Sequence, residues 1–559
     1  MFAEQATPAD VEPVLFTVGL ERGCLILIQV RHDVLLRDLL DPYRGNLEVL
    51  SPLAALHDDA VKNVLLLVSQ EGFRGPNLRT VDRHHRRPIR HRPPRHSCFV
   101  VKHDNHDTRV EDATLPQTVN ALLTDLYELN MVASYLRRDM NGSATFSLFV
   151  RRLPPSRGFI VAAGVESCLD FLEQLRFEEE DLRFLRDRLG FTTADLEAFR
   201  RFRFTGDVWA IPEGRIAFAG EPLVEVTAPL PEAQLIETFL LNRVTFESMI
   251  ASKAARCVIA AAGRDTVDFS FRRTHGIEAG IDVARLSAMV GFAATSNVEA
   301  SRRFGLVAAG TMAHSYVEAF PSEAVAFRAF AEDFPGRVTF LVDTYDTISG
   351  VKSAIAVIRQ LELGGRLGIR LDSGDLGELS RKARRLLDRA GLRDVRIFVS
   401  GSLDELAIDD LVRSGAPVDA FGVGTKMGVS ADYPYLDSAY KLVRYQERPV
   451  MKLSRDKVTA PGRKQVFRRS KPFSDVLGLH EEPVPTGRHR LLEPLMTKGK
   501  RSANRPPLPE SLALFQADLA ALPATTRDLR SPKSPSVRST EALRRLSAET
   551  KQRLLAGLA

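Results

Sequence analysis

The chain has 559 residues, of which 44% are hydrophobic and 26% charged, a composition typical of a globular protein with two or three domains. Its formal charge of +6 does not indicate nucleic-acid binding, because residues 495–559 alone hold 12 Lys and Arg against 5 Asp and Glu. The four cysteines are scattered without metal-type spacing, and no apolar run approaches the roughly 18 residues of a membrane span. The N-terminus also lacks a basic-then-apolar leader, so we expect a cytoplasmic protein without membrane or nucleic-acid partners.

Residues 1–118 differ in composition from the rest of the chain. Two short apolar runs, Cys24–Val30 and Val61–Val68, suit either a strand or a buried piece of helix. Arg79–His96 holds seven Arg, four His and three Pro, and such a tract cannot bury a core. Clustered Arg and irregular His spacing disfavour a metal site there. We therefore expect residues 1–118 to be a disordered or poorly structured extension.

Regular elements begin at Leu122. Helical spacing of apolar residues predicts helices at Leu122–Met140, within Leu169–Phe204, and at Leu235–Ala262, Asp282–Gly291, Asn297–Phe304 and Thr540–Leu558. Alternating or short apolar runs predict strands at Ala144–Val150, within Asp207–Leu230, and at Lys441–Tyr445, Val450–Leu453 and Gln465–Arg468. The mixture indicates an α/β protein.

One unit is repeated four times between residues 338 and 430: an apolar run of strand length, a short polar segment, and a stretch of helix length. The polar segments are Asp343-Thr-Tyr-Asp346, Asp372-Ser-Gly-Asp375, Ser400-Gly-Ser402 and Gly424-Thr-Lys426. Such spacing is typical of β-α units in a parallel sheet or barrel, where ligands bind at the C-terminal ends of the strands. Two ends are acidic and suit a metal, and two are Gly-rich and suit phosphate. Helix caps and tight turns are the alternative explanation.

Eight short motifs in a fixed order resemble nicotinate phosphoribosyltransferase, over the stretch from Leu122 to about Arg545. They are Leu123-Thr-Asp-Leu-Tyr127, Thr205-Gly-Asp-Val-Trp-Ala-Ile-Pro-Glu-Gly214, Phe269-Ser-Phe-Arg-Arg273, Ala294-Thr-Ser-Asn-Val298, Gly310-Thr-Met-Ala-His-Ser-Tyr316, Arg370-Leu-Asp-Ser-Gly-Asp375, Ser400-Gly-Ser402 and Gly422-Val-Gly-Thr425. The resemblance implies a type II phosphoribosyltransferase fold: an irregular α/β barrel (241–435) beside a smaller discontinuous α/β domain (119–240, completed by about 436–510). A C-terminal helical tail (511–559) follows, and a homodimer with shared active sites is implied.

The reaction implied by the resemblance joins nicotinate to 5-phosphoribosyl 1-pyrophosphate, giving nicotinate mononucleotide and pyrophosphate in NAD salvage, with ATP hydrolysed to ADP and phosphate. Family members phosphorylate the residue that matches His314, and an imidazole can carry a phosphoryl group. Arg370 and Asp372 are the other catalytic candidates, and Asp343, Asp346 and Asp375 are the expected Mg²⁺ ligands. Ser400, Gly401, Ser402, Gly422, Gly424 and Thr425 are expected to bind phosphate.

The nicotinate ring needs a stacking surface and a partner for its carboxylate. Phe269 and Tyr127 are the stacking candidates, with Tyr127 coming from the partner subunit if the family dimer holds; core packing is their alternative role. Arg272 and Arg273 offer forks for the carboxylate, and the family motif favours Arg272. In an extended segment only one of the two can point inward.

Three alternative functions were weighed. Nicotinamide phosphoribosyltransferases carry an Asp where this chain has Ser296 and Asn297, and an Asp would repel a nicotinate carboxylate. An inactive relative acting as a scaffold is disfavoured, because every matched motif position holds a competent residue. A sugar-phosphate aldolase or isomerase would require a Lys or Glu at a strand end, where Lys426 is the only such Lys.

Overall fold

The computed structural model describes residues 120–454 and 459–557, together with four strands nearer the N-terminus. The chain divides into two compact units, Met1–Arg109 and Val110–Ala559. The four strands of the first unit pair antiparallel in the order β3-β1-β2-β4; they are β1 (Leu15–Leu20), β2 (Leu25–Val30), β3 (Leu47–Glu48) and β4 (Val64–Val68). Both apolar runs that suited strand or helix therefore contain strands. Arg79–His96 lies outside the described residues, so its disorder stays a prediction.

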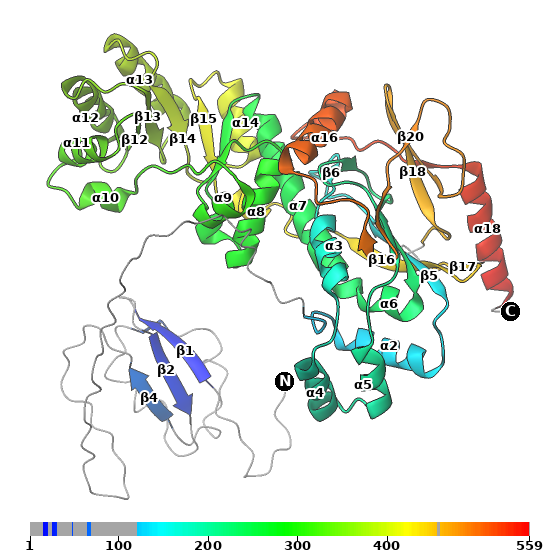
Figure 1. Ribbon diagram of the computed structural model, residues 1–559. Helices are drawn as coiled ribbons and strands as arrows, with labels where there is room; N and C mark the ends of the chain where they lie inside the picture. Colours follow the sequence, from blue (N-terminus) through cyan, green and yellow to red (C-terminus); the bar gives the residue numbers. More distant parts are fainter. Residues whose placement is uncertain are drawn as a thin grey trace, which may run out of the picture. The chain divides into compact units, whose positions relative to one another are not determined.

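A seven-stranded antiparallel sheet is built from chain segments on both sides of the repeated units. Its order is β17-β16-β5-β9-β7-β21-β22, and the neighbouring strands β5, β16 and β17 are labelled in Figure 1. Three strands precede the repeats: β5 (Ser143–Val150), β7 (Asp207–Ala210) and β9 (Pro222–Pro229). Four follow them: β16 (Ser438–Tyr445), β17 (Arg448–Pro449), β21 (Glu493–Thr497) and β22 (Lys500–Arg501). The discontinuous α/β domain is thus present, held together by strand pairing across hundreds of residues.

Two smaller sheets accompany it. One has the order β20-β18-β19-β23, from His489–Arg490, Lys464–Ser470, Phe473–Leu479 and Arg538–Ser539. The other pairs β6 (Ile160–Val161) with β8 (Ile216–Ala217). The predicted strand at Val450–Leu453 is absent from the described structure; the strand nearest to it is β17 (Arg448–Pro449), which ends before Val450 and pairs with β16.

The four repeated units and two preceding strands, β10 and β11, form a six-stranded parallel sheet that curls into a half-barrel, with the order β11-β10-β15-β14-β13-β12. Its strands are β10 (Asp265–Asp268), β11 (Ala294–Thr295), β12 (Arg337–Leu341), β13 (Arg366–Leu371), β14 (Arg396–Val399) and β15 (Ala420–Val423). Phe340, Ile369 and Phe421 are fully buried in it. Burial on both faces is typical of parallel sheets and explains why these strands are continuous apolar runs.

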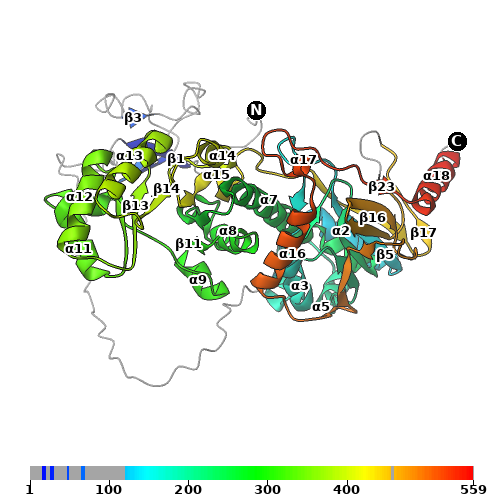
Figure 2. The same ribbon diagram turned by 90° about the horizontal axis from the view of Figure 1, so that it is seen from above.

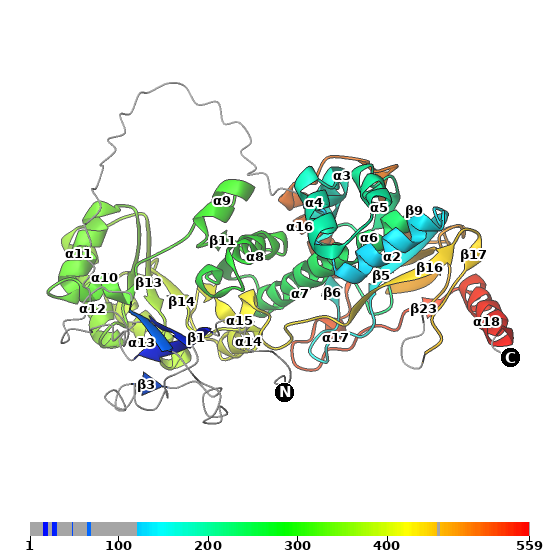
Figure 3. The ribbon, with the colours of Figure 1, turned by 90° about the horizontal axis from the view of Figure 1, so that it is seen from below.

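Helices follow the strands of this sheet, and α12 and α13 lie beside β12, β13 and β14 (Figure 2). They are α10 (His314–Glu318), α11 (Glu323–Asp333), α12 (Thr347–Gln360), α13 (Leu376–Arg389), α14 (Glu405–Arg413) and α15 (Thr425–Gly428). The long helix α7 (Glu237–Ala261) packs against both α14 and α8 (Ile277–Met289) (Figure 3). Because α7 also contacts β6 and β16, it joins the half-barrel to the discontinuous domain.

The remaining helices show where the sequence prediction was coarse. The helical spacing within Leu169–Phe204 corresponds to three helices, the first of which begins before that segment: α3 (Val165–Gln174), α4 (Glu179–Leu189) and α5 (Thr193–Arg200). A separate short helix, α6 (Leu230–Leu235), precedes α7. The others are α2 (Leu126–Arg137), the 3-10 turn η3 (Phe271–Arg273), α9 (Val298–Phe304), α16 (Leu508–Ala521), α17 (Ala524–Arg527) and α18 (Glu541–Ala556).

Candidate active site

The C-terminal ends of the six parallel strands carry polar or aromatic residues in a row that follows the strand order. From one edge of the sheet to the other they are Ser296, Phe269, Gly424, Ser400, Asp372 and Asp343. Parallel pairing brings all these ends to one edge of the sheet, as the repeat predicted. The candidate site is therefore assembled from segments between Phe269 and Gly424, which are 155 positions apart in the sequence.

Arg370, Asp372 and Ser400 form the most closely bonded group in this row. Arg370 donates from Nη2 to Asp372 Oδ1 at 2.6 Å and from Nε to Ser400 Oγ at 2.8 Å. The Ser400 hydroxyl in turn donates to the same Asp372 oxygen. Burial alone would raise the pKa of Asp372, but the Ser400 hydrogen bond and the Arg370 charge lower it overall. Asp372 is therefore an anion at neutral pH, held in one orientation beside a fixed guanidinium.

His314 lies next to this group at the first residue of α10. Its Nδ1 is 3.1 Å from Thr344 Oγ1, and its Nε2 is 3.9 Å from Asp372 Oδ2. The imidazole is 41% exposed, so it is not a core histidine. Arg370 Nη1 also donates to Thr311 Oγ1 at 3.2 Å, which ties the loop before His314 to β13. An exposed, oriented imidazole beside an anion is suited to accept and release a phosphoryl group.

Phe269 forms an aromatic wall beside Arg370. The Arg370 guanidinium carbon lies 5.2 Å from the centroid of the Phe269 ring, within cation–π distance. The ring also meets Phe398 at a centroid distance of 5.5 Å. Gly422 leaves the room that the ring occupies, because a Cβ there would lie 2.8 Å from Phe269 Cδ2. Phe269 is half-buried, so one part of the ring remains open to a ligand.

The four strand-end aspartates have two different roles. Asp346 caps α12 by accepting from Ser349 N at 2.8 Å, and Asp375 caps α13 by accepting from Glu378 N at 2.8 Å. Helix capping, the alternative explanation for these residues, is thus their observed contact. Asp343 Oδ2 accepts from Asp372 N at 2.9 Å, joining the ends of β12 and β13.

The fit of this acidic set to Mg²⁺ is partial. Asp343 Oδ1 is buried without a hydrogen-bond partner, which suits a cation ligand. Across residues 120–454 and 459–557, no three His, Cys, Asp or Glu side chains gather closely enough to hold a metal. Asp343, Asp346 and Asp375 therefore do not form a preformed cage. Mg²⁺ commonly binds through one or two carboxylates and substrate phosphates, and Asp343 fits that mode.

Glu323, the first residue of α11, is a buried carboxyl group near these aspartates. Its Oε1 has no hydrogen-bond partner, and a Cβ on Gly350 would lie 3.0 Å from that oxygen. The pKa of Glu323 is raised to about 7, chiefly by burial and in smaller part by the charges of Asp346 and Asp343, against a hydrogen bond from Ser353 that lowers it. No sequence motif or spacing singles out this residue.

Asn297 does not face a base pocket. It is fully buried and caps α9, with Oδ1 accepting from Ala300 N at 3.0 Å and Nδ2 donating to Gly280 O at 3.1 Å. Its neighbour Ser296 is exposed at the end of β11. Of the two residues predicted to distinguish nicotinate from nicotinamide, only Ser296 presents its side chain to solvent.

Arg272 and Arg273 lie in the 3-10 turn η3 and not in an extended segment, so alternation does not decide between them. Both side chains are exposed, and among the described contacts neither has a hydrogen-bond partner. Tyr127 is 49% exposed on α2, which packs against α5 and α6 of the discontinuous domain. A role for Tyr127 in a partner's site stays a prediction.

The two Gly-rich loops are shaped by close backbone approach. Gly401 has φ +92°, and a Cβ there would lie 1.8 Å from Asp372 O, so only glycine fits. Ser402 adopts the left-handed conformation with φ 52°. Gly424 precedes Thr425, the exposed first residue of α15. Turn geometry alone accounts for these conformations, and phosphate binding at these loops stays a prediction.

Thr344, Thr311 and Asp268 are site residues that the sequence did not single out. Asp268, fully buried at the end of β10, accepts from Ser270 Oγ at 2.6 Å and Thr295 Oγ1 at 2.7 Å, and so fixes the loop that carries Phe269. Thr311 lies in the motif Gly310–Tyr316, and Thr344 lies in the polar segment Asp343–Asp346. A threonine side chain has no chemistry that indicates a site role before its contacts are known.

Comparison with known proteins identifies relatives over about three quarters of the chain. The family model for the nicotinate phosphoribosyltransferase (NAPRTase) N-terminal domain matches residues 122–245, and that for the NAPRTase family matches residues 265–468. Nicotinate phosphoribosyltransferase pncB2 of Mycobacterium tuberculosis is 48% identical over 420 residues, 74% of this chain and 90% of the relative. The human nicotinate phosphoribosyltransferase is 34% identical, covering 78% of this chain and 97% of the relative. The crystal structure of human nicotinic acid phosphoribosyltransferase superimposes with a TM-score of 0.68 at 30% identity, covering 76% of this chain and 99% of that one.

Proposed function

Because the chain belongs to the nicotinate phosphoribosyltransferase family, we propose that it joins nicotinate to 5-phosphoribosyl 1-pyrophosphate in NAD salvage, with ATP hydrolysis coupled to turnover. The observation that carries this proposal is the meeting of Phe269, Arg370, Asp372 and His314 at one edge of the parallel sheet. An aromatic surface, a fixed cation, a fixed anion and an exposed imidazole are the groups that this reaction needs.

The chemical step requires positioning rather than covalent help from the protein. The pyridine nitrogen of nicotinate forms a bond to the anomeric carbon, while the bond from that carbon to pyrophosphate breaks and both electrons leave with the pyrophosphate. Phe269 would hold the ring flat, and Arg370 would offset negative charge on the leaving group. Asp372 and Ser400 keep the guanidinium in place, because both bond it directly.

A bound Mg²⁺ would supply positive charge that offsets the charge of the diphosphate. Asp343 would hold it through its unpartnered Oδ1. The backbone N–H groups of Ser400-Gly-Ser402 and of Gly424 and Thr425 would receive the ribose 5-phosphate, because glycine lets the backbone approach closely. Exposed Ser296 places a neutral hydroxyl near the end of β10, which favours an acid over an amide substrate.

His314 is the proposed phosphoryl acceptor from ATP, and its exposure and fixed orientation support this role. We also propose that the protein forms a homodimer with shared active sites and that it is cytoplasmic. In the part of the chain that the structure describes, every helix is too short or too polar to cross a bilayer.

The test is to incubate the protein with nicotinate, nicotinamide or quinolinate, each with phosphoribosyl pyrophosphate and Mg²⁺, and to identify products by mass. We expect nicotinate mononucleotide from nicotinate, formed faster with ATP. Radiolabelled γ-phosphate should appear on the protein as an acid-labile, base-stable adduct that His314→Ala abolishes. The variant should retain some ATP-independent transfer, because Arg370 and Asp372 remain. A folded His314→Ala protein that still labels from ATP would contradict the assignment.

A further inference from the structure

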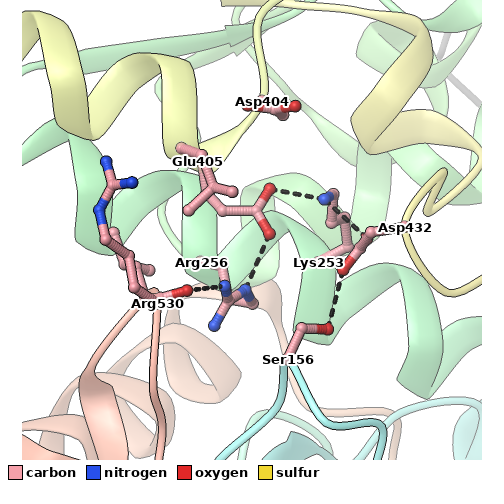
Figure 4. Close-up of a pocket in the computed structure, with 9 residues that line it drawn as sticks. Ser156, Lys253, Arg256, Asp404, Glu405, Asp432 and Arg530 are labelled. Carbon is pink, nitrogen blue, oxygen red and sulfur yellow. Dashed lines mark hydrogen bonds and ion pairs between the residues drawn. The ribbon is translucent and has the colours of Figure 1, made fainter.

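A cluster of ion pairs lies against the segments that follow the two Gly-rich loops. We call it the charge cluster: Arg157, Lys253, Arg256, Glu405 and Asp432. Four of these residues line a cavity of about 310 Å³, together with Asp404 and Arg530 (Figure 4). The proposed reaction uses none of them directly.

Glu405 connects the first loop to α7. It is the first residue of α14 and follows Ser402 by three positions. Its buried carboxylate lies 2.5 Å from Lys253 Nζ and 2.9 Å from Arg256 Nε. The two cations are three residues apart on α7 and therefore share one face of that helix. The start of α14 is thus fixed to a 25-residue helix by two ion pairs.

Asp432 connects the second loop to the same helix. It lies shortly after α15, the helix that begins at Thr425, and its Oδ1 is 2.7 Å from Lys253 Nζ. Arg157 holds the other carboxylate oxygen at 2.7 Å. Lys253 therefore forms ion pairs with both segments that follow the Gly-rich loops, through Glu405 after the first loop and Asp432 after the second.

A direct ion pair also joins the two loops. Lys426 on α15 donates from Nζ to Asp404 Oδ2 at 2.8 Å, while Asp404 Oδ1 caps α14 by accepting from Ala407 N at 2.9 Å. Burial alone would raise the pKa of Asp404, but the hydrogen bond from Lys426 lowers it overall. Asp404 is therefore ionised at neutral pH. Its ion pair with Lys426 links the start of α14 to the second loop.

These carboxylates have the wrong sign for a phosphate site. A negative charge close to a bound phosphate opposes binding by Coulomb repulsion. Asp404 and Glu405 follow a proposed phosphate loop immediately, so their contribution to that site has to come through geometry. We propose that Asp404 and Glu405 are positioning residues that hold the two Gly-rich loops at the separation needed for the phosphate of phosphoribosyl pyrophosphate; this inference rests on the proposed function.

The sign of the effect makes the proposal testable. Asp404→Asn can keep the oxygen that caps α14, but it replaces the Oδ2 acceptor of Lys426 by an NH2 group and removes the negative charge, so the Lys426 pair is lost. Positioning predicts that the KM for phosphoribosyl pyrophosphate rises by about fivefold or more, while the KM for nicotinate stays within about twofold. Electrostatics alone predicts the opposite, a lower KM for phosphoribosyl pyrophosphate. Glu405→Gln should move the same constant in the same direction, and Glu405→Asp should restore part of the loss.

Asp388→Asn is the matched control. Asp388 pairs with Arg384 at 2.8 Å, the same distance as in the Asp404–Lys426 pair. It lies at the C-terminal end of α13, whereas the candidate site lies at the N-terminal end of that helix. Its removal changes the net charge equally and should leave both KM values unchanged. Binding of ribose 5-phosphate, measured by calorimetry, should weaken in Asp404→Asn and not in Asp388→Asn.

The outcomes separate this inference from the proposed function. A wild-type protein that makes no nicotinate mononucleotide would remove the proposed function itself. An active wild type whose Asp404→Asn variant has a lower or unchanged KM for phosphoribosyl pyrophosphate would overturn only the positioning role. Equal rises in the KM of both substrates with a lower Tm would do the same, because they indicate general destabilisation. If Glu405→Gln fails to fold, Asp404→Asn still decides.

Discussion

Replacing Gly422 by alanine tests the aromatic wall directly. A Cβ at this position would lie 2.8 Å from Phe269 Cδ2 and 2.9 Å from Phe398 Cζ, where ordinary contact begins at 3.4 Å. The φ of Gly422 is not in the left-handed region, so the backbone accepts alanine and only this contact is strained. Phe269 must move by about 0.6 Å, the difference between 3.4 Å and 2.8 Å. Overpacking of this kind costs about 1–3 kcal/mol of folding free energy.

The functional consequence follows from the ring that moves. Aromatic stacking contributes about 0.5–1.5 kcal/mol beyond area burial. Losing it should raise the KM for nicotinate by about twofold to twelvefold, at about 1.4 kcal/mol per factor of ten. The KM for phosphoribosyl pyrophosphate should change less. Steady-state kinetics with each substrate varied in turn measures both constants, and thermal unfolding measures the cost to stability.

Gly364→Ala is the matched control for this variant. Gly364 also lacks a left-handed φ, and a Cβ there would meet no atom within 4 Å. It should leave both KM values unchanged and stabilise the fold slightly, because alanine restricts the unfolded chain more than glycine does. A folded Gly422→Ala protein with a wild-type KM for nicotinate would refute Phe269 as the stacking surface.

Two further predictions concern neighbouring residues. The folded pKa of Glu323 is about 7, above its ordinary 4.5, so the folded protein holds a proton between those pH values that the unfolded chain releases. Stability should fall as pH rises through that window, and Glu323→Gln should raise Tm at pH 8 while leaving it unchanged at pH 4.5; a variant less stable than wild type at pH 8 would contradict this. Asn297→Asp should lower Tm, because Gly280 O loses its Nδ2 donor at a cost of about 1–3 kcal/mol, whereas Ser296→Asp on the exposed neighbour should weaken nicotinate use with little change in Tm. If a folded Asn297→Asp protein loses nicotinate use while its Tm is unchanged, Asn297 and not Ser296 is the residue that contacts the substrate.

The sequence by itself determined four of the six parallel strands and the edge at which ligands would bind. The apolar runs recur at intervals typical of β-α units, and each is a strand within one residue of its predicted bounds, which are Val338–Val342, Leu367–Leu371, Val395–Val399 and Ala420–Val423. Parallel strands have all their C-terminal ends at one edge, so chemistry-bearing residues placed after each strand must come together. Strand periodicity is a local property, which is why sequence reveals it.

Only the tertiary structure decided what each polar side chain does. An Asp before a helix satisfies the same local pattern whether it caps that helix or binds a cation. The structure shows that Asp346 and Asp375 cap helices, and cation binding by them stays a prediction. His314 and Thr344 meet across 30 residues, and Arg370 reaches Phe269 across about a hundred, because separate strands end side by side. The Lys426–Asp404 pair likewise depends on two loops being neighbours in the sheet. These contacts depend on distances between segments, which no local pattern contains.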